Sequence, residues 1–233
     1  AALGVASRHR RLWGRLIEIL REDSVLEDGP EGLRVTDHPA GGDPEARLQA
    51  LQARFPAAEA ELSLTAHIGR HLAGALQGRT DPLDLLFPDG STAATEKLYR
   101  DSPYLTFYNR MLRDCVADIQ AGQPASRPLR VLESGAGTGG TTSHLLPALD
   151  ALATEYDFTD VSPLFLAKAK RKFAAYPFVR YALLDIEKEP QAQGFEPQRY
   201  DVILAANVLH ATQDLKVTLG HVRRLLAPQG ALL

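Results

Sequence analysis

Residues 133–140, with the sequence ESGAGTGG, hold four glycines in eight positions. An apolar run enters this segment and a helical pattern leaves it. Glycine has no Cβ atom, so the backbone here can turn sharply and approach a ligand closely. The spacing satisfies G-x-G-x-x-G, which is typical of nucleotide-binding turns, although an ordinary glycine turn is the alternative. We predict cofactor contacts from five residues of this loop: Gly135, Ala136, Gly137, Thr138 and Gly139.

Two aspartates end the next two apolar runs. Asp160 lies 20 residues after Gly140, where a nucleoside-binding sheet places a carboxylate that accepts the ribose hydroxyls. Asp185 is placed to accept a hydrogen bond from an adenine amino group, with Leu184 or Ile186 against the ring. A capping or turn role is the alternative for both aspartates. Parallel strands end at one edge of a sheet, so these residues predict a site for an adenosine-bearing cofactor.

Glu133 bears on which cofactor that is. A dinucleotide seats its pyrophosphate on a helix N-terminus, whereas S-adenosylmethionine carries no phosphate. Glu133 lies two residues before Gly135 and would bring negative charge close to a phosphate. It would suit an ammonium group, either directly or through neighbouring backbone. Composition favours neither cofactor.

His210 is a candidate general base. It follows the fourth apolar run, at the edge where the ligand is expected, and imidazole exchanges protons near neutral pH. A histidine at a helix start or in the core is the alternative. His67 and His71 have a spacing that can hold a metal on a helix, but we find no third ligand and predict no metal site.

Strand patterns and helical patterns alternate along the chain after a proline-containing linker at residues 121–128, and these elements position the residues described above. This alternation predicts a parallel, doubly wound α/β sheet. We divide the chain into a mostly helical domain, 1–125, and a Rossmann-like domain, 126–233. The strands of the second domain are expected at 129–132, 156–159, 179–184, 200–205 and from 231 onward. Its helices are expected at 141–153, where Pro147 is a point at which the helix can kink or restart, and at 163–176 and 215–226.

The first domain shows a helical stripe over residues 12–20, then two short strands within 24–37. Asp43 and Pro44 predict a capped helix start. Further helices are expected at about 57–77, 92–98 and 104–120, and Cys115 is expected to be a small core residue on the last of these.

Composition excludes several classes of protein. The chain has 233 residues, a net charge of −3 and one cysteine. It lacks the basic field that binds nucleic acid or an anionic membrane, and it has no apolar run of roughly 18 residues that would span a bilayer. One thiol cannot form an internal disulfide, so we expect a cytoplasmic protein. We expect the chain to be a piece of a longer protein, because it has no initial methionine and ends where a strand begins.

The motif E-x-G-A-G-T-G-G-T resembles the first motif of class I S-adenosylmethionine-dependent methyltransferases. Other segments narrow the resemblance to the C-methyltransferase domains of polyketide synthases. It covers residues 96–233 well and the first 90 or so only loosely. The segments are LYRDSPYLTFYNRML, FTDVSPLFLAKAKRKFAAYPFVRYALLDIEKEP, AANVLHAT and VRRLLAPQGALL.

This resemblance implies a Rossmann-like sheet, whose last strands this chain lacks, below an N-terminal helical lid. It implies S-adenosylmethionine as cofactor and methylation of the α-carbon of a β-ketoacyl chain. The partners would be an acyl carrier protein, which holds that chain on phosphopantetheine, and other domains of the same megasynthase. His210 corresponds to the family's base, and the glutamate that orients it falls beyond Leu233.

We further expect cofactor contacts from Glu133, Val161, Ile186 and Asn207, and we expect Tyr99 and Tyr108 to face the substrate from the lid. Core packing is the alternative for the tyrosines. Other functions remain open: an inactive structural methyltransferase domain, a small-molecule O- or N-methyltransferase, and a nicotinamide-dependent oxidoreductase.

Overall fold

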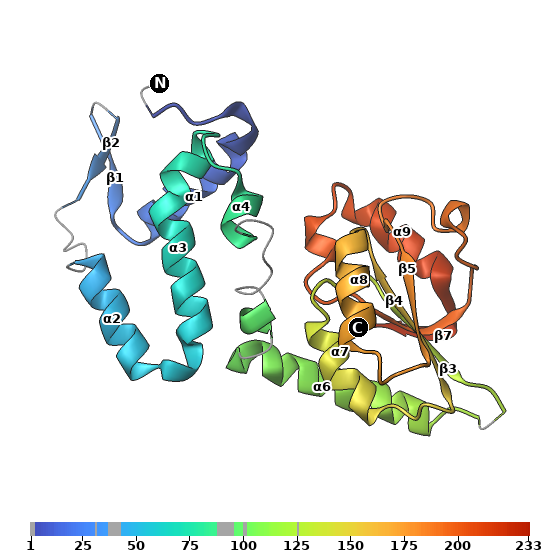
Figure 1. Ribbon diagram of the computed structural model, residues 1–233. Coiled ribbons are helices and arrows are strands. Elements are labelled where there is room, and N and C mark those ends of the chain that lie inside the picture. The colour runs from blue at the N-terminus through green and yellow to red at the C-terminus, as the bar shows by residue number, and fades with distance from the viewer. Residues whose placement is uncertain (1–2, 31, 37–42, 88–95, 100–101, 125) are drawn as a thin grey trace. The chain divides into compact units, whose positions relative to one another are not determined.

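The computed structural model describes residues 3–30, 32–36, 43–87, 96–99, 102–124 and 126–233. The chain forms two compact units, Ala1–Ser102 and Pro103–Leu233 (Figure 1). The division precedes helix α6, Pro103–Ala121, rather than following it as the sequence analysis expects. Helix α6 joins the second unit because its Val116 is fully buried in the core there.

The first unit combines helices with one hairpin. Strands β1 and β2 pair antiparallel, which confirms the two strands predicted within 24–37. Asp43 accepts a hydrogen bond from the backbone of Glu45 at 3.0 Å and caps α2, as predicted. Most of the predicted helix 92–98 lies outside the described residues. The elements are η1 Ser7–His9, α1 Arg10–Glu22, β1 Leu26–Gly29, β2 Gly32–Val35, α2 Pro44–Arg54, η2 Pro56–Ala58, α3 Glu59–Leu76 and α4 Pro82–Leu86.

The second unit is built on a five-stranded sheet with the order β5-β4-β3-β6-β7, in which every pairing is parallel. Strands β4 and β6 are buried along nearly their whole length, as expected for strands that are covered on both faces. The strands are β3 Leu129–Glu133, β4 Thr154–Asp160, β5 Val179–Leu183, β6 Tyr200–Leu204 and β7 Leu226–Leu232.

The chain enters this sheet at its centre. From β3 it continues outward through β4 and β5, and it then crosses to the other side of β3 to form β6 and β7. The order therefore reverses between β3 and β6, and ligands bind such sheets at the carboxyl edge beside this point. The fold confirms the predicted Rossmann-like α/β architecture.

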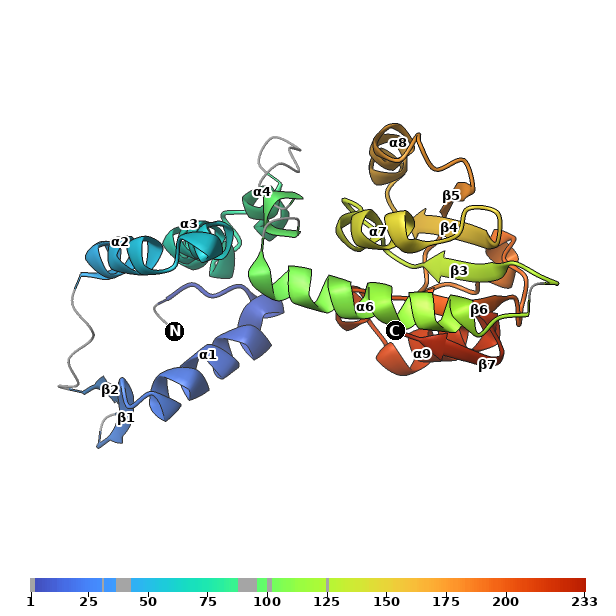
Figure 2. The same cartoon turned by 90° about the horizontal axis from the view of Figure 1, so that it is seen from below.

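Helices cover both faces of the sheet. One core joins β3, β4 and β6 to α6, α7 and α8, and it includes Val131, Phe158 and Leu166. The other joins Leu132 and Ile203 to α9. Figure 2 shows α7 and α8 on one side of the strands and α9 on the other. The connecting elements are α7 Gly140–Leu145, η4 Leu146–Ala148, α8 Pro163–Lys172, η5 Gln191–Gln193, η6 Leu209–Ala211 and α9 Leu215–Leu225.

Three local predictions are wrong in detail. The α-helix expected at 141–153 ends at Leu145, because Pro147 has no amide hydrogen to continue it. Strand β7 begins at Leu226 rather than at residue 231, and it absorbs the Pro-Gln-Gly turn signal as an irregularity in its register with β6. Cys115 is exposed on α6 rather than in the core.

Ser162 stands at the N-cap of α8, but its side chain makes no capping bond. The amide of Ser162 itself donates to Asp160 Oδ1 at 2.8 Å. This hydrogen bond connects the end of β4 directly to the start of α8.

Candidate functional site

The glycine loop links β3 to α7 through alternating left-handed residues. Gly135, Gly137 and Gly139 have φ values of +60°, +54° and +71°, which only glycine adopts without strain. A Cβ atom at Gly135 would stand 2.6 Å from Val208, and one at Gly139 would stand 2.6 Å from the ring of Phe173. Gly135 and Gly139 are therefore required by both conformation and space, and Gly137 is required by conformation.

Hydrogen bonds join this loop to the end of β4. The amide of Ala136 donates to the carbonyl of Thr159, and the amide of Gly137 donates to Asp160 Oδ2, both at 2.9 Å. Asp160 Oδ1 takes the amide of Ser162, so each carboxylate oxygen holds one backbone donor. Each oxygen keeps a free lone pair, which can accept a ribose hydroxyl. Val161, the next residue, is exposed at the same edge.

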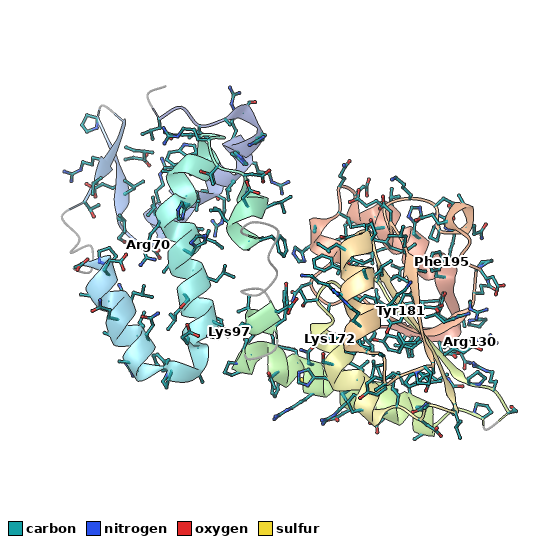
Figure 3. All side chains as sticks on the ribbon, viewed as in Figure 1. Arg70, Lys97, Arg130, Lys172, Tyr181 and Phe195 are labelled. Atoms are coloured by element: carbon teal, nitrogen blue, oxygen red, sulfur yellow. The ribbon has the colours of Figure 1, made fainter. Side chains whose placement is uncertain are left out.

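The ammonium group of Lys172 supports the loop from α8. It donates to the carbonyls of Thr138 and Gly139 at 3.0 and 3.3 Å. Figure 3 shows Lys172 on α8, beside α7. The side chain thus holds two carbonyls at the point where the loop enters α7.

Glu133 is buried, with only 2% of its surface exposed. Its Oε2 accepts hydrogen bonds from Thr142 Oγ1 and from the hydroxyl of Tyr156, both at 2.6 Å. Burial raises the pKa of the Glu133 carboxyl to about 7, against the opposing effect of these two bonds. Its contact with a cofactor stays a prediction. Glu133 fastens the end of β3 to α7 and β4 beneath the loop.

Asp185 lies just beyond β5, with its side chain partly exposed. Its carboxylate accepts the amide of Glu187 at 3.1 Å and pairs with Lys188 at 2.9 Å, and the bond to Lys188 lowers the Asp185 pKa. The bond to Glu187 fits a turn role. The exposed lysine leaves the carboxylate accessible to a further donor. Ile186 is buried in the α9 core, so only its backbone is available to a ligand.

The segment after β6 brings His210 to the same edge. Asn207 is exposed and has a left-handed φ of +56°, which asparagine tolerates better than most residues. Val208 then packs on Gly135, and His210 follows in η6, where it is exposed. The segment that carries His210 is thus in contact with the glycine loop through Val208.

The predicted tyrosines lie in different units. Tyr108 is half exposed on α6, and its ring packs edge-on against Tyr104 at 4.7 Å and Phe107 at 5.4 Å between centroids. Tyr99 belongs to the first unit. Their roles toward a substrate stay predictions.

Among the residues that the structure describes, no three His, Cys, Asp or Glu side chains gather as metal ligands. His71 Nδ1 lies 2.8 Å from the carbonyl of His67, within the same helix. None of the described helices has the length and apolar character needed to cross a membrane.

Several residues that shape the site were missed by the sequence reasoning. Val208, Thr142 and Tyr156 act through contacts with residues far away in the chain, and no local pattern marks them. Gln193, which binds the backbone of Asp185, falls in a turn with no motif.

The hydrogen-bonding and charged groups at the glycine loop indicate which cofactor fits there. The amide of Gly137 is already occupied by the carboxylate of Asp160, which places negative charge at the glycine turn. A pyrophosphate at this turn would be repelled, whereas a ligand with ribose hydroxyls and a positive charge would be attracted. The residues therefore fit S-adenosylmethionine better than a dinucleotide.

Comparison with known proteins agrees with this geometry. A family model described as "Methyltransferase domain" matches residues 132–232. Polyketide synthase ThaG of Burkholderia thailandensis is 37% identical over 236 residues, which are 100% of this chain and 4% of the synthase. The crystal structure of the CurJ carbon methyltransferase has a TM-score of 0.89 and 44% identity, covering 98% of this chain and 61% of that one.

The trans-methyltransferase CalH, solved in complex with SAH, has a TM-score of 0.72 and 30% identity. The match covers 98% of this chain and 63% of CalH. The chain thus spans about three fifths of these solved structures and a small part of ThaG. The sheet order, the glycine loop and these similarities agree: the chain carries an S-adenosylmethionine-dependent methyltransferase domain that is similar to the carbon methyltransferase domains of polyketide synthases.

Proposed function

We propose that this chain binds S-adenosylmethionine and methylates the α-carbon of a β-ketoacyl thioester that is carried on an acyl carrier protein. One observation carries the proposal. The glycine loop is bonded to Asp160 through the Gly137 amide, and it is packed on the His210 segment through Val208. A nucleoside-binding carboxylate and a base thus flank one loop at the carboxyl edge of the sheet.

Different residues of the chain contact different parts of the cofactor. Asp160 accepts the ribose hydroxyls and Asp185 accepts the adenine amino group. The turn at residues 135–139 leaves room for the amino-acid portion, because no side chain stands on its glycines. Val161 and the backbone of Ile186 lie beside the adenine ring, and Asn207 lies beside the glycine loop. When bound, S-adenosylmethionine supplies an electrophilic methyl group.

His210 performs the proton transfer. The α-proton of a β-ketoacyl thioester lies between two carbonyls and is unusually acidic, so imidazole is a strong enough base to remove it. Proton removal leaves the α-carbon as the nucleophile that takes the methyl group. The exposure of His210 in η6 supports this role, since a large thioester must reach it from solvent.

The proposed partners follow from the same chemistry. A β-ketoacyl chain is delivered as a thioester on phosphopantetheine, so the partner is an acyl carrier protein within a larger synthase. The name of the relative ThaG, a polyketide synthase, supports this context. Within the second unit, the half-exposed Tyr108 on α6 is the side chain proposed to face the substrate.

A methyl-transfer assay tests the proposal. The purified protein is incubated with S-adenosylmethionine and a β-ketoacyl pantetheine thioester, and the product is identified by mass. His210→Ala should reduce transfer about a hundredfold or more while retaining cofactor binding. The matched control is His71→Ala, at an exposed histidine of α3. Equal rates for His210→Ala and the unaltered protein would remove His210 as the base. Methylation of free hydroxyl compounds in place of the thioester would overturn the substrate class.

A further inference from the structure

Residues 185–189, called here the adenine-side loop, connect β5 to the turn before η5. They have no helix or strand pairing of their own. A bond from the amide of Lys188 to the carbonyl of Asp185, at 3.0 Å, closes one turn within the loop. The shape of the rest depends on side chains outside it.

Gln193 in η5 holds the first residue of this loop. Its Oε1 accepts the amide hydrogen of Asp185 and its Nε2 donates to the Asp185 carbonyl, both at 2.9 Å. One side-chain amide therefore satisfies both backbone groups of one residue, as a neighbouring strand would. The same Nε2 lies 3.3 Å from the carbonyls of Lys188 and Glu189.

His221 of α9 holds the next residue. Its Nδ1 lies 2.7 Å from the carbonyl of Ile186, and the imidazole is 5% exposed. A carbonyl can only accept, so Nδ1 carries the proton and donates. Loss of this donor would leave the carbonyl beside a buried cavity without a partner.

Apolar packing completes the attachment. Leu184 and Ile186 are buried in the same core as Phe195 and Val222. Arg224 of α9 also pairs with Glu189 at 2.8 Å, at the surface. Both ends of the adenine-side loop are thus fastened to elements that carry no proposed cofactor contact themselves.

We propose that Gln193 and His221 are positioning residues for adenine recognition. They fix the backbone on either side of the Asp185 side chain, so that its carboxylate faces the exocyclic amino group of a 6-aminopurine. This inference rests on the proposed function, because it requires adenosine to bind at this edge. Neither residue touches the cofactor, and neither takes part in proton transfer.

A change of base in the ligand tests this directly. S-inosylhomocysteine carries a carbonyl oxygen where S-adenosylhomocysteine carries the amino group, so it presents an acceptor to Asp185. The dissociation constants of both ligands are measured by calorimetry for each variant, and thermal unfolding is recorded in parallel. The variants are Gln193→Ala, His221→Leu, His221→Asn and the control Gln191→Ala, in the exposed part of η5.

We expect the unaltered protein to bind the adenine ligand about tenfold or more tightly than the inosine ligand. The inosine ligand loses the hydrogen bond to Asp185, and its carbonyl oxygen is repelled by that carboxylate. Gln193→Ala and His221→Leu should reduce this preference to less than about threefold. His221→Asn retains an N–H donor near the position of Nδ1 and should keep it. Gln191→Ala should also keep it.

The outcomes separate the two claims. If the adenine and inosine ligands weaken equally in Gln193→Ala and His221→Leu, the residues serve stability alone and the inference is overturned. If the unaltered protein binds both ligands equally well, the inference fails while cofactor binding stands. If it binds neither, the proposed function fails as well.

Discussion

The side chain of Val208 lies so close to Gly135 that a Cβ atom on residue 135 would stand 2.6 Å from Val208 Cγ2. This contact joins the glycine loop to the segment that carries His210, although the two are far apart in the sequence. The absence of a side chain at residue 135 therefore serves two purposes. It permits the left-handed backbone of the loop, and it admits the segment that holds the proposed base.

Gly135→Ala should disturb both functions. The new methyl group meets Val208 and the backbone is held at φ +60°, so we expect a loss of about 2 kcal/mol or more in the free energy of unfolding. Cofactor affinity should fall with it. Gly220→Ala is the matched control, since that helical glycine has open space around it and alanine favours the helix. Urea unfolding of both variants checks this, and equal stability for Gly135→Ala and the unaltered protein would refute it.

Glu133→Gln should change how stability depends on pH. Burial raises the pKa of Glu133 from 4.5 to about 7, so the folded state binds more protons than the unfolded chain between these values. This raised pKa contributes to the free energy of unfolding. The contribution is fully present below pH 4.5, and up to about 3 kcal/mol of it is lost as the pH rises through 7. Glutamine cannot ionise and should flatten this slope. Unfolding free energies at pH 5 and pH 8 check the sign, and a slope unchanged in the variant would contradict the burial argument.

Tyr156→Phe should cost more at high pH than at low pH. The Tyr156 hydroxyl donates to Glu133 at 2.6 Å, and a donor stabilises the charged acceptor more than the neutral one. We expect a loss of about 1–2 kcal/mol at pH 8 and a smaller loss at pH 5. Tyr176→Phe, where the ring packs on Phe178, serves as the control. A loss independent of pH would indicate packing alone.

Asp201→Asn should lower stability without changing cofactor affinity. Asp201 accepts two hydrogen bonds from Arg127, at 2.7 and 2.8 Å, and one from the amide of Arg130. Loss of this charge-assisted set should cost about 2 kcal/mol. The residue lies at the start of β6, at the amino edge of the sheet and away from the proposed site. Calorimetry together with unfolding separates the two effects, and weakened cofactor binding in this variant would contradict the placement of the site.

Much of the fold follows from local pattern. The apolar runs of β3 and β6, the cap at Asp43 and the hairpin after α1 are marked by adjacent residues and match the structure. The assignment of α6 to the second unit depends instead on contacts such as Thr141 donating to Asn109, which lie 32 residues apart. The early start of β7 depends on pairing with β6. No neighbouring residue signals either feature.

In the candidate site, too, some residues are recognised from local sequence, whereas the surroundings of others depend on packing. The glycines, Asp160, Asp185 and His210 are recognised by their places at strand ends, which position them at one edge. Glu133 was assigned a cofactor contact from its charge and position. Its burial is set by Thr142 and Tyr156, whose approach is decided by the packing of α7 and β4. The bonds of Glu133 to Thr142 and Tyr156 thus follow from the fold, whereas its contact with a cofactor stays a prediction.

Calorimetric titration of S-adenosylmethionine into the protein tests the central claim most directly, beside Asp160→Ala and the control Asp150→Ala. Asp150 is exposed before β4, at the opposite edge of the sheet from Asp160. The account predicts binding in the micromolar range, kept by Asp150→Ala and weakened about tenfold or more by Asp160→Ala. A folded protein that shows no binding, or an Asp160→Ala variant that binds as tightly as the unaltered protein, would contradict it.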